Sequence, residues 1–559
     1  MKHEKYELTF KTATGDLKKV PAVVGENILQ VAIRAGVDID APCSGNGTCG
    51  KCRVKLIFGT VDAEKSTHIS KDDINDGWRL ACKCNVSGDA TLLVPDAAEA
   101  FRSGIHTAGL TSEAEIRRYD AAMSAIFASE IERGIKEQGI GLAIDIGTTT
   151  VTCVLLDFKT FKILSGASAG NGQIRYGADV INRIIQSSKP GGKERLQCAI
   201  REETIDPLID ELCRNASIDS NSITRAVIVG NTTMQHLLVG ADAESIRLEP
   251  YVPTFLELIG ETAGSLGLPI ASGAPVVFAP NVGSYVGGDI TAGVLASMMW
   301  ADDEMTLLLD IGTNGELVFG NSDFMLCCAC SAGPAFEGGD ISCGMRATSG
   351  AIKAVTIDAE TMNPVLDIIG GAAPAGLCGS GLLDTVSELF RCGIINARGK
   401  IERDGPRIRR GEYESSYVLA LSSESATMRD IELTETDIDN FIRAKGAIFS
   451  AIRSMVSSLD MEMSDIDRIL IAGGIGGGIN IKNAISIGML PNVPEDKYKY
   501  IGNSALTGAC AMLQSDMAEQ KVYETGRNMT YLELSSHPGY MDEFVAACFL
   551  PHTDADLFK

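Results

Sequence analysis

The strongest constraint on the fold is a strand pattern that occurs twice in the chain. Segments 141–157 (GLAIDIGTTTVTCVLLD) and 307–320 (LLLDIGTNGELVFG) both place Asp-Ile-Gly-Thr between two apolar, strand-like runs. Between residues 141 and 515 such runs alternate with helical patterns, which is typical of α/β layers. The repetition predicts an internal duplication with two similar α/β halves.

Each copy also has the residues of a phosphate-binding turn. The first strand ends in Asp145, and the N–H and hydroxyl groups that can face a phosphate belong to Gly147, Thr148, Thr149 and Thr150. The second strand ends in Asp310, which is followed by Gly312, Thr313, Asn314, Gly315 and Glu316. Either aspartate can bind Mg²⁺ directly or through water. Two such turns facing each other would hold a nucleotide from both sides.

Three more segments complete the pattern. Segments 286–297 and 503–513 read as helices of small residues, and segment 469–480 is a strand followed by a turn rich in glycine, with Gly473, Gly474, Gly476 and Gly477. In this order the five elements resemble phosphate 1, connect 1, phosphate 2, adenosine and connect 2 of the ASKHA superfamily, which contains acetate and sugar kinases, heat-shock chaperones and actin. The resemblance implies two ribonuclease-H-like halves with ATP between them.

Two further residues receive alternative interpretations. By motif position, Asp289 corresponds to the residue that positions the attacking water in that superfamily, and its other interpretation is a helix cap. Lys445 lies in a predicted helix before the adenosine strand. It could touch the nucleotide, but a solvated helix lysine is the default expectation.

The N-terminal 97 residues contain a different kind of site. Cys43, Cys49 and Cys52 form a C-x5-C-x2-C loop, and Cys82 follows after 29 intervening residues. This arrangement resembles the plant-type [2Fe–2S] ferredoxin pattern, except that the first spacing is five residues, as in adrenodoxin-like relatives, and not four. Gly45, Gly47 and Gly50 would give the loop its tight turns. A zinc knuckle is the alternative, although zinc sites favour two separated Cys pairs.

Cys84 competes with Cys82 for the place of fourth ligand. The Arg79-Leu80-Ala81-Cys82 sequence is found at the fourth ligand of related ferredoxins, so the resemblance favours Cys82.

Four other cysteines lie close together in the second half: Cys327, Cys328, Cys330 and Cys343. They could form a second metal site. Because adjacent residues of a strand face opposite ways, buried structural thiols are the preferred interpretation.

Length and charge limit the remaining possibilities. At about 150 residues per domain, the 559 residues predict three to four domains. Together with the segment patterns, the two resemblances imply four regions: a β-grasp, α+β ferredoxin-type domain (1–97), a helical linker (98–140), a first ASKHA half (141–302) and a second ASKHA half with a tail (303–559). The formal net charge of −24 argues against nucleic-acid binding. No apolar run of 18 residues and no signal-peptide core occur, so we expect a cytoplasmic protein without a membrane span.

The whole chain resembles the reductive activators of corrinoid-dependent enzymes. The matching segments are 230–238, 280–289, 332–347, 377–384, 472–480 and 541–554. The resemblance implies that a [2Fe–2S] cluster delivers one electron to a corrinoid protein of a methyltransferase system and reduces Co(II) to Co(I). It also implies ATP and Mg²⁺ as cofactors and an upstream low-potential reductant. A homodimer is an open alternative to a single chain.

Physical chemistry explains why such a reaction needs ATP. A plant-type cluster has a reduction potential near about −400 mV, and reduction of Co(II) from there is uphill. Each ~59 mV uphill lowers the equilibrium constant for one electron about tenfold.

Three other functions are alternatives to corrinoid reduction. The first is an ATP-driven electron donor to another low-potential enzyme, such as 2-hydroxyacyl-CoA dehydratase. The second is a chaperone-like binding module with a structural cluster, and the third is a simple electron carrier whose large domain docks a partner.

Overall fold

The first copy of the repeated motif lies in a five-stranded sheet of order β10-β9-β6-β7-β8. The structure, a computed structural model of the chain, describes residues 5–12, 15–37, 39, 41, 45, 47, 50–66, 68–69, 71–95, 112–135, 137–412, 414–474 and 476–558. In this sheet, three strands form an antiparallel meander: β6 (Ile140–Ile146), β7 (Thr150–Asp157) and β8 (Ile163–Gly170). β9 (Ile223–Gly230) joins β6 in parallel, and β10 (Val276–Phe278) joins β9 in parallel.

The second copy lies in a sheet with the same order, β21-β20-β11-β12-β13, to which β22 is added. Its strands are β11 (Thr306–Ile311), β12 (Gly315–Gly320), β13 (Met325–Cys330), β20 (Arg468–Ala472), β21 (Tyr498–Gly502) and β22 (Thr530–Tyr531). Again an antiparallel meander is extended by two parallel strands. The shared topology confirms the duplication that the Asp-Ile-Gly-Thr repeat predicts.

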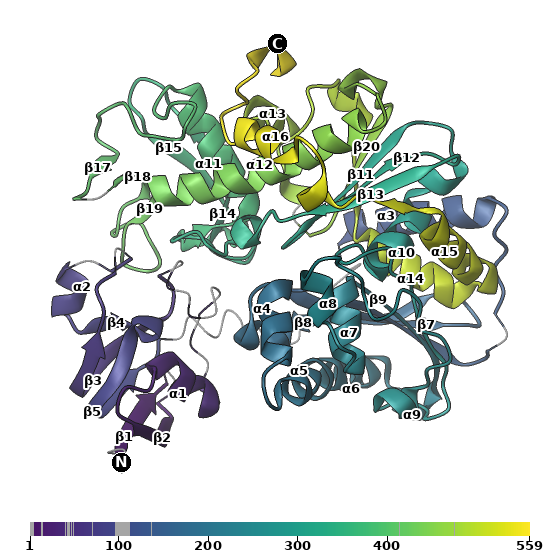
Figure 1. Cartoon of the computed structure of the whole chain (residues 1–559), viewed down its shortest axis with the longest axis horizontal. Helices are drawn as coiled ribbons and strands as arrows, with labels where there is room; N and C mark the ends of the chain where they lie inside the picture. Colours follow the sequence, from purple (N-terminus) through teal and green to yellow (C-terminus); the bar gives the residue numbers. More distant parts are fainter. Residues whose placement is uncertain are drawn as a thin grey trace.

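Helices cover both sheets (Figure 1). Those of the first half are α4 (Val180–Ser187), α5 (Gly192–Ile200), α6 (Asp206–Ala216), α7 (Thr232–Val239), α8 (Glu244–Arg247) and α9 (Ala263–Leu266). Those of the second half are α11 (Gly379–Arg391), α12 (Glu435–Ser457), α13 (Ile481–Ser486), α15 (Asp516–Asn528) and α16 (Tyr540–Ala547). Two small sheets are inserted in the second half, formed by β14 (Ala351–Ile357), β15 (Pro364–Ile368), β16 (Gly376–Leu377), β17 (Ile408–Arg410), β18 (Ser415–Ala420) and β19 (Ile431–Thr434).

Two helices of small residues pack against each other where the halves meet. They are α10 (Gly288–Ser297) and α14 (Ser504–Gln514), the elements expected to connect the two halves. The backbones approach so closely that a Cβ atom added at Gly508 would lie 2.1 Å from the carbonyl oxygen of Ala292. Small side chains are therefore needed at this crossing, and one apolar core runs through it from sheet to sheet.

Gly508→Ala should destabilise the chain by about 3 kcal/mol or more, because the added methyl group meets backbone and not a movable side chain. Gly273→Ala is the matched control, since an added Cβ there has no atom within 4 Å. Urea unfolding of both variants measures the difference. Equal stability of Gly508→Ala and Gly273→Ala would contradict the close crossing.

The described part of the predicted helical linker contains one helix, α3 (Glu113–Ala128), which packs on the ASKHA-type halves. It begins with a capping box between Ser112 and Glu115. Its buried residues are Tyr119, Met123 and Ile126, whereas Ile116 is exposed. The reason is its neighbours: α3 packs on α10 and α14, and the side-chain amide of Gln514 donates to the Tyr119 hydroxyl over 3.2 Å.

The N-terminal region is a separate small sheet with a core of its own, of order β2-β1-β5-β3-β4. Its elements are β1 (Lys5–Lys11), β2 (Leu17–Val23), α1 (Ile28–Arg34), β3 (Arg53–Ala63), α2 (Lys71–Asn75), β4 (Trp78–Leu80) and β5 (Cys84–Leu93). β1 pairs with β2 in an antiparallel hairpin and with β5 in parallel. α1 covers one face with buried Ile28, Leu29 and Val31.

Lys445 is not the solvated helix lysine of the default expectation, because its side chain is fully buried in α12. A contact with the nucleotide stays a prediction. The ammonium group donates to the carbonyl oxygens of Phe549 and Pro551, over 2.5 and 2.7 Å. It therefore fixes the C-terminal tail to the long helix, and burial lowers its pKa to about 7.

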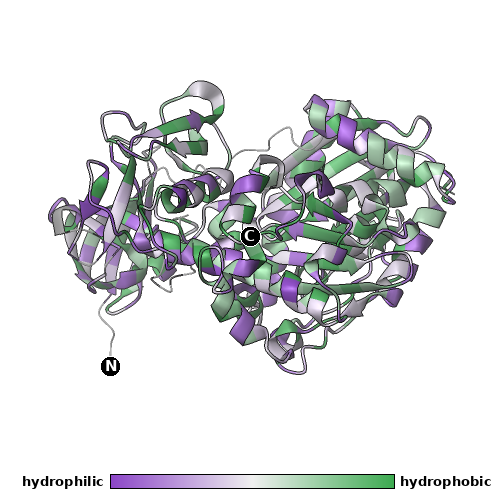
Figure 2. Cartoon of the chain, turned by 90° about the horizontal axis from the view of Figure 1, so that it is seen from above, coloured by the Kyte–Doolittle hydropathy of each residue, from purple (hydrophilic) through white to green (hydrophobic). Residues whose placement is uncertain are grey.

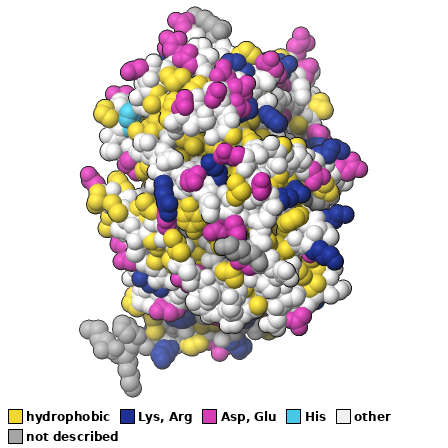
Figure 3. All heavy atoms as spheres, turned by 90° about the vertical axis from the view of Figure 1, so that its right-hand side faces the viewer, with side chains coloured by type: hydrophobic (Ala, Val, Ile, Leu, Met, Phe, Trp, Pro, Cys, Tyr) yellow, Lys and Arg dark blue, Asp and Glu magenta, His cyan; other side chains and the backbone are white. Residues whose placement is uncertain are grey.

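Apolar residues concentrate on the strands and on the inner faces of the helices (Figure 2). On the face shown in Figure 3, acidic and basic side chains are interspersed, with small groups of apolar atoms between them. Among the residues that the structure describes, no helix combines the length and the apolar character needed to cross a bilayer.

Candidate functional site

The two repeated turns bring their aspartates to one place between the halves. Asp145, near the end of β6, accepts a hydrogen bond of 2.7 Å from the side-chain amide of Asn503, just before α14. Asp310, near the end of β11, lies against the glycine-rich turn, because a Cβ atom added at Gly473 would be 2.6 Å from its Oδ1. Phosphate, adenosine and connecting elements thus meet as their order in the sequence predicts.

Four carboxyl groups share this place: Asp145, Asp289, Asp310 and Glu316. Burial raises the pKa of Asp145 to about 6 and, together with the charge of Asp145, that of Asp310 to about 7. The pKa values of Asp289 and Glu316 are also raised, by burial first and then by neighbouring carboxylates. Such a concentration of carboxyl groups favours the binding of a cation among them.

Asp289 stands in the first turn of α10, but it is not the residue that caps the helix. Gly287 holds the N-cap position, and Oδ1 of Asp289 accepts from the backbone N–H of Ile290 over 2.9 Å. The charges of Asp310 and Asp145 both act on its carboxyl group. Asp289 therefore lies among the carboxylates of the two turns.

The residues fit a magnesium ion that arrives with a nucleotide. Within the described ranges, no three His, Cys, Asp or Glu side chains converge closely enough to hold a metal ion on their own. Mg²⁺ is commonly bound by one or two protein carboxylates, with phosphate oxygens and water as its other ligands. Asp145 and Asp310 can supply those carboxylates.

These pKa shifts predict a pH dependence of stability without nucleotide. The pKa values of Asp145 and Asp310 rise from 3.8 to about 6 and about 7, so the folded chain holds more protons than the unfolded chain in that range. The free energy of unfolding contributed by these groups is therefore lost as pH rises from about 4 through about 7. Asp310→Asn removes one of them. Its melting temperature relative to wild type should rise by about 2 °C or more between pH 5 and pH 8 in calorimetry, and a constant difference would contradict the shift.

The two phosphate turns touch through threonine hydroxyl groups. Oγ1 of Thr149 lies 2.8 Å from Oγ1 of Thr313, and each hydroxyl lies 2.7 Å from Oε2 of Glu337. The neighbouring hydroxyl of Thr148 points elsewhere, because it accepts from the side chain of buried Asn231 over 3.0 Å. Thr149 and Thr313 are therefore the hydroxyl groups that face each other between the halves.

Both turns are tight, but the second is one residue shorter. The N–H of Gly147 donates to the carbonyl oxygen of Thr150, and that of Gly312 donates to the carbonyl oxygen of Asn314, both over 3.0 Å. The strand pairing closes at Ile146 and Val151 in the first copy and at Ile311 and Gly315 in the second. Each copy thus returns in a short hairpin directly after its aspartate.

The sequence motifs give no role to two arginines and one glutamate of this site, although Glu337 and Arg346 lie in the matching segment 332–347. Arg183 in α4 is fully buried, and its guanidinium donates to the carbonyl oxygen of Thr148 over 2.5 Å. Arg346 approaches the carbonyl oxygen of Thr149 over 3.5 Å. The charge of Glu337 acts on both arginines. Only the fold brings α4 and the 337–346 segment to the first turn.

The glycine-rich turn has the open backbone expected of it. Gly473 adopts a left-handed φ of +87°, and its carbonyl oxygen accepts from the hydroxyl of Tyr500 over 3.0 Å. A Cβ atom added at Gly474 would have no atom within 4 Å, whereas one added at Gly477 would lie 2.9 Å from the Tyr500 ring. Gly476 begins a short 3₁₀ turn, Gly476–Gly478. Arg118 of α3 lies over the Tyr500 ring at 4.7 Å.

The cysteine site of the N-terminal region is described in part. Cys52 and Cys82 lie together, with the backbone N of Cys82 3.5 Å from the Sγ of Cys52. Cys43 and Cys49 lie outside the described residues. A Cβ atom added at Gly45 would lie 3.8 Å from the Cβ of Cys82, so Gly45 lies beside Cys82. The expected left-handed glycines are present, with φ of +90°, +77° and +65° at Gly45, Gly47 and Gly50.

Cys82 and Cys84 have different surroundings. Cys82 sits in a 3₁₀ turn, Ala81–Lys83, and is partly exposed. Cys84 begins β5, opposite Ala63 of β3, and is 1% exposed in the core of the region. The position of Cys82 beside Cys52 and Gly45 fits a cluster ligand, whereas Cys84 fits a packed core thiol.

The four cysteines that lie close together in the sequence of the second half pack in or against apolar cores. Cys327 and Cys328 face opposite sides of β13, because they pack in two different apolar cores. Cys330 shares the core of Cys328, and Cys343 packs at its edge. Burial raises the pKa of each of these thiols. This arrangement agrees with the expectation of buried thiols.

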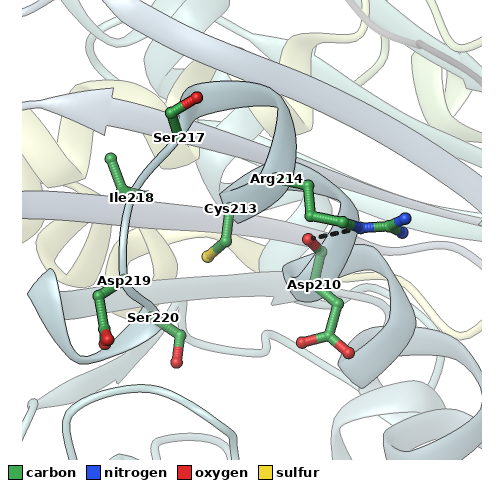
Figure 4. Close-up of a pocket in the computed structure, with 7 residues that line it drawn as sticks. All are labelled: Asp210, Cys213, Arg214, Ser217, Ile218, Asp219 and Ser220. Carbon is green, nitrogen blue, oxygen red and sulfur yellow. Dashed lines mark hydrogen bonds between the residues drawn. The ribbon is translucent and has the colours of Figure 1, made fainter.

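A cavity of about 520 Å³ lies away from these motifs, at the end of α6 (Figure 4). It is lined by Asp210, Cys213, Arg214, Ser217, Ile218, Asp219 and Ser220. Arg214 donates to the carbonyl oxygen of Asp210 within its own helix. None of the residues of the predicted sites takes part in it.

Comparison with known families and proteins agrees with this arrangement. Residues 12–87 match the 2Fe-2S iron-sulfur cluster binding domain, residues 140–302 match the RACo middle region, and residues 304–559 match the C-terminal domain of RACo, the ASKHA domain. A solved structure described as a reductive activator for corrinoid,iron-sulfur protein is similar over 99% of both chains, with 38% identity and a TM-score of 0.70. The chain belongs to the RACo family of reductive activators of corrinoid proteins.

Two curated relatives extend the RACo comparison. The corrinoid activation enzyme RamQ of Eubacterium limosum is 34% identical over 421 residues, which are 73% of this chain and 70% of RamQ. The [Co(II) methylated amine-specific corrinoid protein] reductase of Methanosarcina barkeri is 21% identical over 426 residues, 70% of this chain and 73% of that protein. The matches confirm the expected fold class for this RACo member: a ferredoxin-type domain followed by an ASKHA-type domain.

Proposed function

We propose that the chain uses binding and hydrolysis of Mg·ATP to deliver one electron to a corrinoid protein of a methyltransferase system. The electron reduces Co(II) to Co(I) and returns the corrinoid to methyl transfer. A [2Fe–2S] cluster, held by Cys43, Cys49, Cys52 and Cys82, would supply the electron and be re-reduced by an upstream low-potential donor. The names of RamQ and of the Methanosarcina barkeri reductase support the corrinoid protein as partner.

The observation that carries the proposal is the meeting of the two phosphate turns. The hydroxyl oxygens of Thr149 in the first half and Thr313 in the second half lie 2.8 Å apart, so an anion that binds both hydroxyl groups would contact both halves at once. A ligand shifts a conformational equilibrium only through different affinities for the two states. A nucleotide held by both halves meets that condition, because its contacts change when the halves move.

The residues around the turns have roles that follow from their chemistry. Asp145 and Asp310 would hold Mg²⁺, and the turns from Gly147 to Thr150 and from Gly312 to Glu316 would bind phosphate. Asp289 would orient the attacking water. Gly473, Gly474, Gly476 and Gly477 would lie along the adenosine. We further propose domain limits at 1–97, 98–140, 141–302 and 303–559.

The experiment is the ATPase activity of the full-length protein with and without its partner. We expect a corrinoid protein in the Co(II) state to stimulate hydrolysis by about tenfold or more, and the same protein in the Co(I) state to stimulate it much less. Equal ATPase activity with both cobalt states would contradict the proposal.

A further inference from the structure

One short loop contacts both the nucleotide motifs and the N-terminal region. The loop runs from Gly333 to Met345 and contains a 3₁₀ turn, Pro334–Glu337. At one end, Glu337 lies 2.7 Å from the hydroxyl groups of Thr149 and Thr313. At the other, the ammonium group of Lys51 donates to the carbonyl oxygens of Gly338 and of Gly344, the latter over 3.2 Å.

The carboxylate of Glu337 and a phosphate would compete for the same hydroxyl groups. A hydroxyl has one proton to donate, so Thr149 and Thr313 together have two. In this structure Glu337 lies within hydrogen-bond distance of both. Phosphate oxygens bound there would take these donors and would repel the carboxylate, because like charges at close range disfavour each other. Phosphate binding therefore requires Glu337 to move.

Movement of Glu337 would reach the carbonyl group that Lys51 binds. Gly338 directly follows Glu337, and the 3₁₀ turn lies between two glycines with left-handed φ, +72° at Gly333 and +77° at Gly338. Glycine adopts such angles without strain, so these two positions are suited to be hinges.

The far side of the loop is fixed. The backbone N–H of Ser342 donates to Asp437 of α12 over 2.7 Å, and the side chain of Asn440 donates to the carbonyl oxygen of Asp340 over 2.8 Å. Displacement of Glu337 is thus confined to the Gly338 end, and it would separate the Gly338 and Gly344 carbonyl groups. A Cβ atom added at Gly344 would lie 2.5 Å from the Gly338 oxygen, so the two backbones touch at present.

Lys51 ties the N-terminal region to this loop. It lies between Cys49 and Cys52 in the sequence. A second contact involves the same region: Arg429 lies over the Trp78 ring at 5.1 Å and 4.0 Å from a carboxylate oxygen of Asp73. The docking of the N-terminal region on the second half thus depends on Lys51 and on a loop whose position depends on Glu337.

We infer that Glu337 and Lys51 are positioning residues that couple phosphate binding between the halves to release of the ferredoxin-type region. The inference rests on the proposed function in that the phosphate belongs to ATP. Coupling of this kind is reciprocal: if nucleotide weakens docking, then weakened docking strengthens nucleotide binding by the same factor.

The test uses the full-length protein with its cluster and the non-hydrolysable probe Mg·AMPPNP. Calorimetry measures the affinity, and hydrogen exchange of segment 71–80 measures docking. In wild type we expect AMPPNP to raise exchange of this segment severalfold. Lys51→Met should raise the affinity about tenfold and show high exchange before nucleotide is added, and Lys51→Arg should restore wild-type behaviour. Glu337→Gln should also raise the affinity about tenfold, because the competing charge is removed.

Two matched variants serve as controls. Lys19→Met removes a lysine of the same region whose partner, Glu7, lies with it in the β1–β2 hairpin, away from segment 71–80, and Glu360→Gln removes an exposed carboxylate. Both should match wild type, and the visible spectrum of the cluster checks the integrity of every variant. If AMPPNP binds wild type, Lys51→Met and Glu337→Gln alike and exchange does not change, the coupling is overturned while nucleotide binding stands. If AMPPNP binds none of them, the proposed function is overturned and the coupling with it.

Discussion

Asp310→Asn should lower the rate of Mg·ATP hydrolysis by about 10³-fold or more while the visible spectrum of the cluster stays unchanged. Asp310 lies near the end of β11 beside Gly473 and among the other carboxylates, where it can hold the cation of the nucleotide. A bound Mg²⁺ stabilises the charge that develops on the transferred phosphoryl group by several kcal/mol, which corresponds to such a loss of rate. The amide of asparagine keeps the size of the side chain but removes its charge.

The same variant separates the two sites of the chain. Cys52 and Cys82 belong to the N-terminal region, which has a sheet and a core of its own, so loss of hydrolysis should not disturb the cluster site. Asp323→Asn is the matched control, because it makes the same substitution at an exposed aspartate in the turn after β12. It should hydrolyse ATP at the wild-type rate. Full ATPase activity of Asp310→Asn would contradict the role of the second turn.

Cys82→Ser should remove most of the [2Fe–2S] spectrum, whereas Cys84→Ser should leave the cluster in place. Cys82 lies beside Cys52 and Gly45, whereas Cys84 packs in the core at the start of β5. A serine hydroxyl is a poor substitute for a thiolate on iron, while a buried cysteine mainly contributes packing.

Iron and sulfide analysis after anaerobic purification measures this difference. We expect about two iron and two sulfide per chain in wild type and in Cys84→Ser, and less than half of that in Cys82→Ser. Thermal unfolding of both variants distinguishes loss of the cluster from loss of the fold. Greater loss of iron in Cys84→Ser would contradict the ligand assignment.

Much of the fold could be predicted because it follows from residue patterns within single segments of the sequence. The repeated Asp-Ile-Gly-Thr segment predicts two similar halves, and the two sheets share one strand order. The small residues of segments 286–297 and 503–513 predict two helices, and these form α10 and α14, which cross where Gly508 meets Ala292. These signals lie within single segments, so no knowledge of distant contacts is needed to find them.

The sequence could not reveal contacts between segments far apart in the chain. The lysine side chains of Lys51 and Lys445 look like ordinary solvated groups, yet one binds a loop almost 290 residues away and the other holds the C-terminal tail. Arg183 lies in no motif, and the matching segment 332–347 gives no role to Glu337; only packing brings them to the first phosphate turn. Local periodicity has no information about such partners.

The most direct test of the central claim is a single turnover of the pre-reduced full-length protein with a Co(II) corrinoid protein, Mg·ATP and no other reductant. Absorbance should show Co(I) forming at the same rate at which the cluster is oxidised, one cobalt per cluster, and about a hundredfold more slowly without ATP. That factor corresponds to an activation barrier lowered by about 2.7 kcal/mol when the nucleotide is present. Formation of Co(I) at the same rate without ATP, or hydrolysis of ATP with the cluster still reduced and cobalt still Co(II), would contradict the account.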